Sequence, residues 1–292
     1  MIRFSKYLWL YFLISALVLV PGIYSVVRFG LRPAIDFTGG TLLEIQFVRD
    51  IPQNMIELVA NKDGLPLVSI QKTSLNTYLL RMKPGSSEKL VAFQTGLATS
   101  VGEVPNVVRN ETVGPILGKE LLQKTLAAAM IAVIGILLYV AWAFKNIRFG
   151  VAAVVALIHD LLVVVGVFSL LGKFAGVEVD TLFVTAILTT MSFSVHDTIV
   201  VFDRIRELLR GKEKAGIAEI SDLALTETMG RSLANSFTIM FMLLALVLLG
   251  GFTVRWFALA LLIGTVSGTY SSPFVATPIL ILWDRFEKRK RK

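Results

Sequence analysis

Residues Thr181 to Arg206 read TLFVTAILTTMSFSVHDTIVVFDRIR, and this stretch decides the fold. It is long and apolar enough to cross a bilayer, which takes about 20 residues. It nevertheless carries His196 and Asp197 in its interior. An ionised carboxylate costs about 3 kcal/mol or more at the centre of a bilayer, so a carboxyl retained there indicates a functional site. The stretch therefore predicts a membrane-spanning helix built around Asp197.

Helical periodicity divides the side chains of this stretch into faces, at about 100° per residue. One face carries Thr190, Ser194 and Asp197. An adjoining row, the polar stripe, consists of Thr185, Thr189, Ser192 and His196. The opposite side is apolar and is predicted to meet lipid: Val184, Leu188, Met191, Val195, Ile199 and Phe202. Since polar side chains at membrane depth must meet protein or water, we expect a functional polar face, with a purely structural hydrogen-bond cluster as the alternative.

The composition of the whole chain agrees with a membrane protein. Of its 292 residues, 55% are hydrophobic and only 17% are charged, and the mean hydropathy is +0.72. These values exclude an ordinary soluble domain and indicate a polytopic α-helical membrane protein. The net charge of +8 does not indicate nucleic acid binding, because Lys and Arg lie beside the apolar segments. The absence of Cys excludes disulfides, thiol catalysis and Cys-based metal sites.

Six apolar segments predict six transmembrane helices. The first lacks the small-residue cleavage site of a signal peptide, the rival interpretation, and is expected to stay uncleaved. The six segments are 7–27, 125–144, 149–171, 181–202, 232–249 and 256–283. The expected organisation is an N-terminal tail with helix 1, an extracytoplasmic α+β domain, helices 2–6 and a basic cytoplasmic tail, at 1–30, 31–120, 121–283 and 284–292.

The polar region 31–120 predicts a small domain of strands and helices. Its strands are expected at 41–48, 68–73, 77–82 and 106–112, and its helices at 52–61 and 87–100. This βαββαβ order is typical of the ferredoxin-like arrangement. The region has no His and no metal-ligand spacing, so its acidic residues Asp36, Glu44 and Glu57 are expected to be solvated or to cap helices.

Charge predicts the orientation of the spans. The loops between spans two and three and between four and five, and the C-terminal tail, hold most of the Lys and Arg outside residues 31–120. If the chain alternates, these segments lie on the same side as Arg3 and Lys6, while the opposite short loops carry only Lys173 and Arg255. The positive-inside rule then places both termini in the cytoplasm and the α+β domain outside. The tail is expected to anchor the topology, with contact to anionic lipid or ribosomal RNA as the alternative.

A second charged position opens the fifth span. Arg231, Asn235 and Thr238 share one helix face. Because the fourth and fifth spans are antiparallel neighbours in the chain, packing between them would bring Arg231 to Asp197. An Arg that snorkels to the interface as a topology charge fits the same position.

Two other spans carry notable residues. His159 and Asp160 lie near the middle of the third span, either as a second ionisable site or as a satisfied structural pair. Gly264, Gly268 and Ser272 follow at four-residue intervals in the sixth span, and such small residues predict close packing on another helix, in this chain or a partner.

The sequence lacks the enzymatic motifs that some of its residues suggest. Gly172 and Lys173 lack the upstream Gly of a phosphate-binding loop. There is no H-E-x-x-H motif, and the two His residues fall on different spans. We therefore expect no enzyme activity, no cofactor and no metal.

Residues 194–207, SVHDTIVVFDRIRE, resemble the fourth-span signature of the SecF branch of the SecD/SecF family of protein-export membrane subunits. Further motifs of this family agree in order along the whole chain: IDFTGG at 35–40, VGPILGKEL at 113–121, ALIHD at 156–160 and SGTYSS at 267–272. Members of this branch pair with SecD, a second six-span subunit, or are fused to it. The pair resembles transporters of the resistance-nodulation-division superfamily.

The resemblance implies that the chain uses a proton or sodium gradient to help complete export through the SecYEG channel. The implied partners are SecD, SecYEG, further Sec accessory subunits and the translocating polypeptide. The essential intramembrane Asp of the family falls on Asp197 and its Arg falls on Arg231. Two departures, His196 where Asn is usual and Asn235 where Thr is more frequent, leave the coupling ion open. Candidates for a secondary polar relay are His196, His159, Asp160, Thr190, Ser194 and Asn235.

Two other functions are weighed against this one. Half of a small-molecule or lipid exporter of the same superfamily would carry a far larger outer domain than one of about 90 residues, itself a usual single-domain size. A passive scaffold of the channel would make the charge of Asp197 dispensable.

Overall fold

The computed structural model describes residues 3–65, 67–83, 87–144, 146–211 and 216–290. Parts of the predicted basic loop and tail, 212–215 and 291–292, lie outside the described residues. The chain forms two units: the first comprises Met1–Arg32, Ala128–Val177 and Leu182–Lys292, and the second Pro33–Ala127 and Glu178–Thr181.

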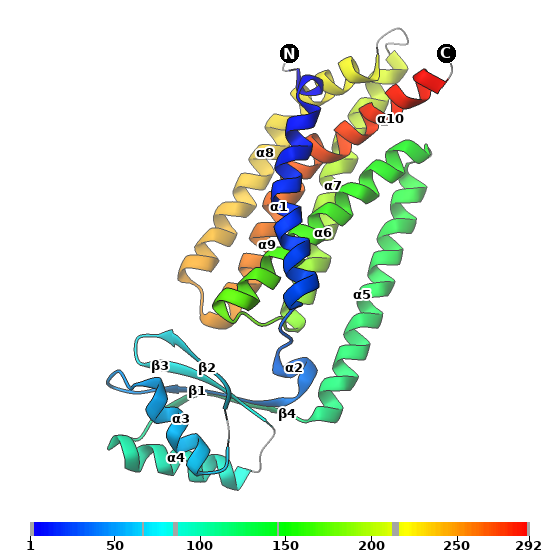
Figure 1. The fold of residues 1–292 in the computed structure, drawn as a ribbon. Helices are drawn as coiled ribbons and strands as arrows, with labels where there is room; N and C mark the ends of the chain where they lie inside the picture. The colour runs from blue at the N-terminus through cyan, green and yellow to red at the C-terminus, as the bar shows by residue number, and fades with distance from the viewer. Residues whose placement is uncertain (1–2, 66, 84–86, 145, 212–215, 291–292) are drawn as a thin grey trace. The chain divides into compact units, whose positions relative to one another are not determined.

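Six helical segments of the described chain are long and apolar enough to span a membrane, as predicted. They are α1 (Leu8–Phe29), α5 (Pro115–Ala143), α6 (Ile147–Ala175), α7 (Thr181–Gly211), α8 (Ile217–Leu249) and a last segment formed by α9 (Phe252–Ser271), the π-helical turn η2 (Ser272–Ala276) and α10 (Thr277–Lys290) (Figure 1). Helices α5 and α8 begin well before the predicted 125 and 232. Their first turns are polar but still favour helix, and Pro115 suits the first helical position, so hydropathy alone missed them.

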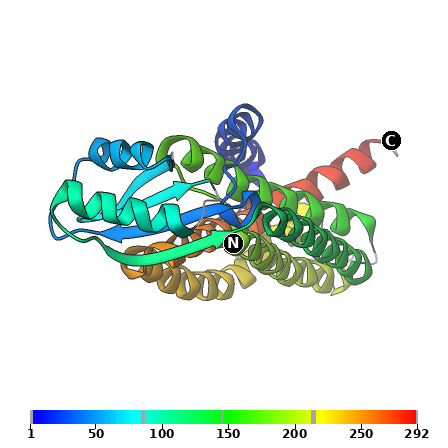
Figure 2. The same ribbon diagram turned by 90° about the horizontal axis from the view of Figure 1, so that it is seen from below.

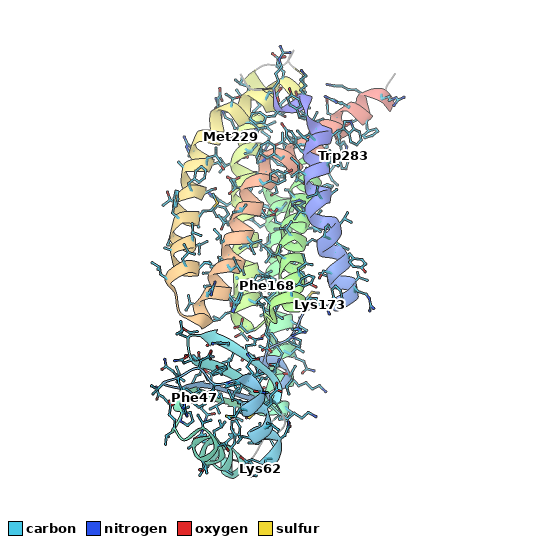
Figure 3. The ribbon with its side chains drawn as sticks, turned by 60° about the vertical axis from the view of Figure 1, so that its left-hand side comes forward. Phe47, Lys62, Phe168, Lys173, Met229 and Trp283 are labelled. Atoms are coloured by element: carbon cyan, nitrogen blue, oxygen red, sulfur yellow. The ribbon has the colours of Figure 1, made fainter. Side chains whose placement is uncertain are left out.

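In the first unit, α1 packs along α6, α6 along α9, and α9 along α8. Glycines bring the first pair together: a Cβ added to Gly166 of α6 would lie 2.7 Å from the Cα of Gly22 on α1. The hydroxyls of Ser25 and Ser169 hydrogen bond one turn further along, at 2.8 Å. Phe168 is 1% exposed and lies inside the bundle (Figure 3). Helices α1, α6, α9 and α8 are thus packed against one another in that order.

Half of the apolar side of α7 is buried, which corrects the predicted lipid face; Val184, Leu188 and Ile199 are half-buried. Met191, Val195 and Phe202 are 3%, 6% and 0% exposed and pack in the core of the first unit. They fit there beside the small side chains of α6, Ala152, Ala153 and Ala156. Every member of the polar stripe is exposed instead. Periodicity shows that two helix faces differ, but not which of them the other helices of the chain cover.

The second unit contains, in the described residues, a four-stranded antiparallel sheet. Its strands β1 (Gly40–Gln46), β2 (Leu67–Ser74), β3 (Thr77–Met82) and β4 (Asn106–Val113) lie in the order β2-β3-β1-β4. Helices α3 (Gln53–Lys62) and α4 (Ser87–Val101) cover one face (Figure 2). Alternate residues of β1 and β3 point into the core beneath these helices, among them Leu43, Ile45, Tyr78 and Leu80. All six predicted elements are confirmed within two residues at each end.

Candidate functional site

Asp160 of α6 is the centre of a buried hydrogen-bond cluster. Its carboxylate accepts hydrogen bonds from Ser194 of α7 and from Ser267 and Ser271 of α9, each at 2.6 Å. Nδ1 of His159 lies 3.0 Å from the same group. Asp160 is only 3% exposed. Because each serine hydroxyl can donate, this ring of hydrogen bonds satisfies both carboxyl oxygens of Asp160 and ties three helices together.

Asp197 of α7 has one donor instead of four. Its Oδ1 accepts a hydrogen bond from Ser232 of α8, whereas its buried Oδ2 has no partner among the described residues. The side chain is buried, with 8% of the residue exposed. One oxygen of Asp197 is therefore free to take a proton.

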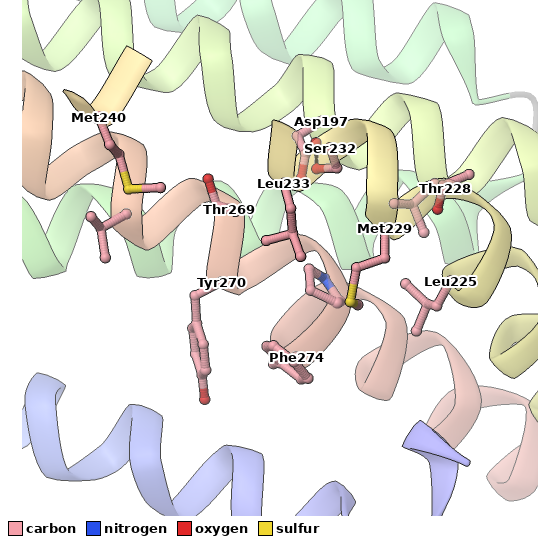
Figure 4. A pocket seen from close by; sticks show the side chains of 13 residues that line it. Asp197, Leu225, Thr228, Met229, Ser232, Leu233, Met240, Thr269, Tyr270 and Phe274 are labelled. Atoms are coloured by element: carbon pink, nitrogen blue, oxygen red, sulfur yellow. Dashed lines mark hydrogen bonds between the residues drawn. The ribbon is translucent and has the colours of Figure 1, made fainter. Parts of the chain in front are cut away.

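A cavity of about 230 Å³ lies beside Asp197, between α7, α8, α9 and η2 (Figure 4). A water molecule takes about 30 Å³ in the liquid, so the cavity has room for several. The walls are mostly apolar and consist of Val201, Leu225, Thr228, Met229, Ser232, Leu233, Met240, Val266, Thr269, Tyr270, Pro273 and Phe274. The cavity thus gives the carboxyl of Asp197 both space and an apolar surrounding.

The predicted packing stripe of α9 and η2 lies against α7 of the same chain. Its members face α7 in the pairs Gly264–Thr190, Gly268–Ser194 and Ser272–Thr198. A Cβ added to Gly264 would lie 2.3 Å from Cγ2 of Thr190, so this approach requires glycine. The stripe is covered within the chain, and it does not by itself call for a partner.

Arg231 and Asn235 are exposed on α8. Arg231 lines a separate surface hollow with the acidic residues Asp203, Glu207 and Glu227. In the described part of the chain it forms no ion pair, and the contact to Asp197 comes from the next residue, Ser232. The sequence did not single out Ser232; the one available signal was a hydroxyl inside an apolar span.

His196 lies on a different face of α7 from Asp197. It lines a hollow of about 360 Å³ together with Ser192 and with residues of α5. The α5 residues of this hollow, called the α5–α7 hollow below, are Ala132, Gly135, Ile136 and Tyr139. Of the predicted relay residues, Asp160, His159 and Ser194 meet in one cluster, with Thr190 one turn from Ser194, whereas His196 and Asn235 lie outside it.

Two stretches of this chain match models of a known protein family. Residues 94–286 match the family described as "Protein export membrane protein SecD/SecF, C-terminal". Residues 24–51 match the "SecD/SecF GG Motif". The chain belongs to the SecD/SecF family.

Individual relatives within the SecD/SecF family agree. The "Protein translocase subunit SecF" of Thermobaculum terrenum is 40% identical over 97% of this chain and 94% of its own length. The subunits of the same name from Anaerolinea thermophila and Vibrio alginolyticus are 37% and 36% identical. A crystal structure of SecDF from Thermus thermophilus, a "translocon-associated membrane protein", superimposes with a TM-score of 0.88 at 31% identity. That match covers 97% of this chain but only 39% of the SecDF chain.

The GG motif of the SecD/SecF family has a steric basis in the second unit. Gly39 and Gly40 have φ values of 71° and 144°, which side chains rarely adopt. A Cβ added to Gly39 would lie 2.8 Å from the Cα of Pro115, at the start of α5. A Cβ added to Gly118 would lie 2.8 Å from the backbone N of Gly39. These glycines therefore let the chain before β1 pack directly on the first turn of α5.

Proposed function

We propose that the chain is an auxiliary subunit of the Sec protein-export machinery that works with a SecD-type subunit. The support is the match over nearly its full length to subunits named protein translocase subunit SecF. The SecDF neighbour supports the partner, because this chain corresponds to only 39% of it. The SecYEG channel, further Sec subunits and the translocating polypeptide complete the proposed assembly. We propose transport without an enzymatic step.

Asp197 couples export to an ion gradient in this proposal. The observation that carries it is the unpartnered, buried Oδ2 of Asp197, a residue that lines a cavity large enough for water. With Arg231 outside contact, an ionised Asp197 would be a buried charge without a counter-ion, so the present arrangement suits the neutral carboxyl. When the proton leaves, Arg231 is expected to approach. Each charge moved across the membrane supplies about 2.3 kcal/mol per 100 mV, which can bias a helix rearrangement.

The SecD-type subunit covers the α5–α7 hollow in this proposal. The polar stripe is exposed in the isolated chain, and polar side chains at membrane depth need protein or water. A homologous half related by a pseudo-two-fold axis along the membrane normal would provide that cover.

The proposed setting is the bacterial inner membrane. Both termini lie in the cytoplasm, and the ferredoxin-like domain lies outside. Reporter fusions after Lys83, expected outside, and after Arg289, expected inside, check this orientation; the reverse pattern for either fusion would refute it.

The test of the function is Asp197→Asn, which keeps the shape of the side chain and removes its titration. Inverted membrane vesicles with the SecD-type subunit are expected to lose gradient-dependent export while protein abundance stays normal. Asp50→Asn is the control, because its side chain is 61% exposed and lies in the second unit, away from Asp197 in the chain. Export equal to the parent in Asp197→Asn would favour a passive scaffold. Gradient-dependent efflux of a small molecule or lipid by the parent, without effect on export, would favour an exporter.

A further inference from the structure

The short loop before α7 belongs to the second unit by its contacts. Residues Glu178–Thr181 cluster with the sheet-containing unit. Val179 forms a parallel backbone bridge with Pro33, and its carbonyl oxygen accepts the N–H of Ala34 at 2.8 Å. The segment that leads into β1 and the segment that leads into α7 are thus paired through their backbones.

Asp36 caps the start of α7. Its Oδ2 accepts the backbone N–H of Thr181 at 3.4 Å and the hydroxyl of the same residue at 3.2 Å. Thr181 is the first residue of α7, whose N–H has no partner within the helix. A carboxylate in this position also interacts favourably with the helix dipole. The cap comes from a residue far away in sequence, within the stretch that matches the GG motif.

Arg81 of β3 binds the loop before α7, Glu178–Thr181, to the sheet. Its guanidinium pairs with Glu178 and donates to the carbonyl oxygen of Pro33 at 2.9 Å and to the hydroxyl of Thr38 at 2.8 Å. The side chains of Arg81 and Glu178 are only 13% and 23% exposed. One planar cation with several fixed donors thus joins strand β3, the loop before α7, and the segment that holds Pro33 and the short helix α2 (Ile35–Thr38). We call this set of contacts the clamp; its residues are Pro33, Ala34, Asp36, Arg81, Glu178, Val179 and Thr181.

We infer that the clamp is the mechanical link between α7 and the sheet, with Asp36 and Arg81 as positioning residues. Helix α7 carries Asp197 and begins inside the clamp, so any shift of α7 pulls on Glu178–Thr181 and through Arg81 on β3. This path adds to the direct chain connections through α1 and α5. The clamp stays closed throughout the transport cycle. The inference rests on the proposed function, since it needs a rearrangement of α7 to transmit.

A disulfide across the backbone bridge tests whether the clamp stays closed. Neighbouring strands lie about 4.8 Å apart, within the Cα range of disulfides, so Pro33→Cys with Val179→Cys can cross-link. The chain has no other Cys. In vesicles with the SecD-type subunit, the oxidised pair is expected to export like its reduced form. Export that stops on oxidation and returns on reduction would show that the clamp must open, and would overturn the inference.

Removal of the cap tests whether the clamp transmits. Asp36→Ala is expected to raise amide hydrogen exchange at Thr181 about 5-fold, the equivalent of about 1 kcal/mol for a lost N-cap, and to reduce gradient-driven export. Asp36→Asn is the matched control, because its carboxamide oxygen still accepts from Thr181. The oxidised cysteine pair in the Asp36→Ala background is expected to restore export.

Two results would contradict the clamp: full export in Asp36→Ala despite the faster exchange, or no recovery of export on cross-linking. A parent complex without gradient-dependent export would instead refute the proposed function. The exchange measurement on Thr181 would still report on the cap in that case.

Discussion

Asp160 and Asp197 show how donor number separates two carboxyls at membrane depth. Asp160 has hydrogen-bond partners on both oxygens from three helices, so neither oxygen is left open. Asp197 has one donor and one open oxygen beside a cavity. The first arrangement holds helices together, and the second leaves room for a proton to come and go. We therefore propose a structural role for Asp160 and a coupling role for Asp197.

Loss of the Asp160 carboxyl should lower the stability of the folded protein, and not only impair ion coupling. Asp160→Ala leaves three buried serine hydroxyls without their shared acceptor, and removing one partner of a buried charged network costs about 3 kcal/mol or more. Thermal unfolding of the purified complex in detergent should show a clearly lower midpoint for Asp160→Ala. Asp197→Asn should unfold close to the parent. Equal stability of Asp160→Ala and the parent would contradict the assigned role.

The sequence predicts some residues of the site, such as Asp197, but not others, such as Ser232. Asp197 was identified because a lone carboxyl in an apolar stretch has a high cost whatever surrounds it. Ser232 was missed, because a Ser in an apolar span carries no such cost and its role depends on which helix face meets Asp197. The partners of Asp160 depend in the same way on the packing of α6, α7 and α9.

At the scale of elements, the contact between α7 and α9 depends on backbone approach. Gly264 has almost no space, since its added Cβ would lie 2.3 Å from Thr190, whereas the nearest atom for Gly268 is 3.2 Å away. For Gly150 of α6, nothing lies within 4 Å. The space available for a side chain thus increases from Gly264 to Gly268 to Gly150, all within the first unit.

Alanine substitutions along this series should rank accordingly. Gly264→Ala is expected to destabilise by about 1–3 kcal/mol through overpacking, and Gly268→Ala by less. Gly150→Ala should be neutral or stabilising by up to about 1 kcal/mol, because Ala favours helix. Thermal unfolding of the three variants checks the order. A variant Gly264→Ala as stable as Gly150→Ala would contradict the close contact.

The elements themselves were largely predictable. Apolar length predicted the spans, and alternation with turn residues predicted the strands of the second unit, because both patterns are local. The predicted lipid face of α7 is wrong at Met191, Val195 and Phe202, which are buried, since apolar side chains suit either lipid or a protein core. The early start of α5 was missed for a related reason: residues 115–124 are polar enough to leave a membrane and still form helix.

At the scale of the whole molecule, the exposed polar stripe points to assembly. The proposed SecD-type partner would bury Ser192 and His196, which line the α5–α7 hollow. A large side chain at this position should therefore block docking without disturbing the fold of the isolated chain.

Ser192→Trp is expected to abolish copurification with the SecD-type subunit while the variant chain keeps its abundance in membranes. Leu17→Trp on α1 is the control, because Leu17 is 72% exposed and lies away from the hollow. Copurification at the parental level in Ser192→Trp would place the partner elsewhere.

In the proposed mechanism, Asp197 alternates between the neutral and the ionised form. Infrared difference spectroscopy of the complex in lipid vesicles, recorded across a pH step, observes carboxyl protonation directly. A protonated-carboxyl band is expected to appear on acidification in the parent and in Asp50→Asn, and to be absent in Asp197→Asn. A band that persists in Asp197→Asn, or a parent without any titrating carboxyl in the membrane region, would contradict it.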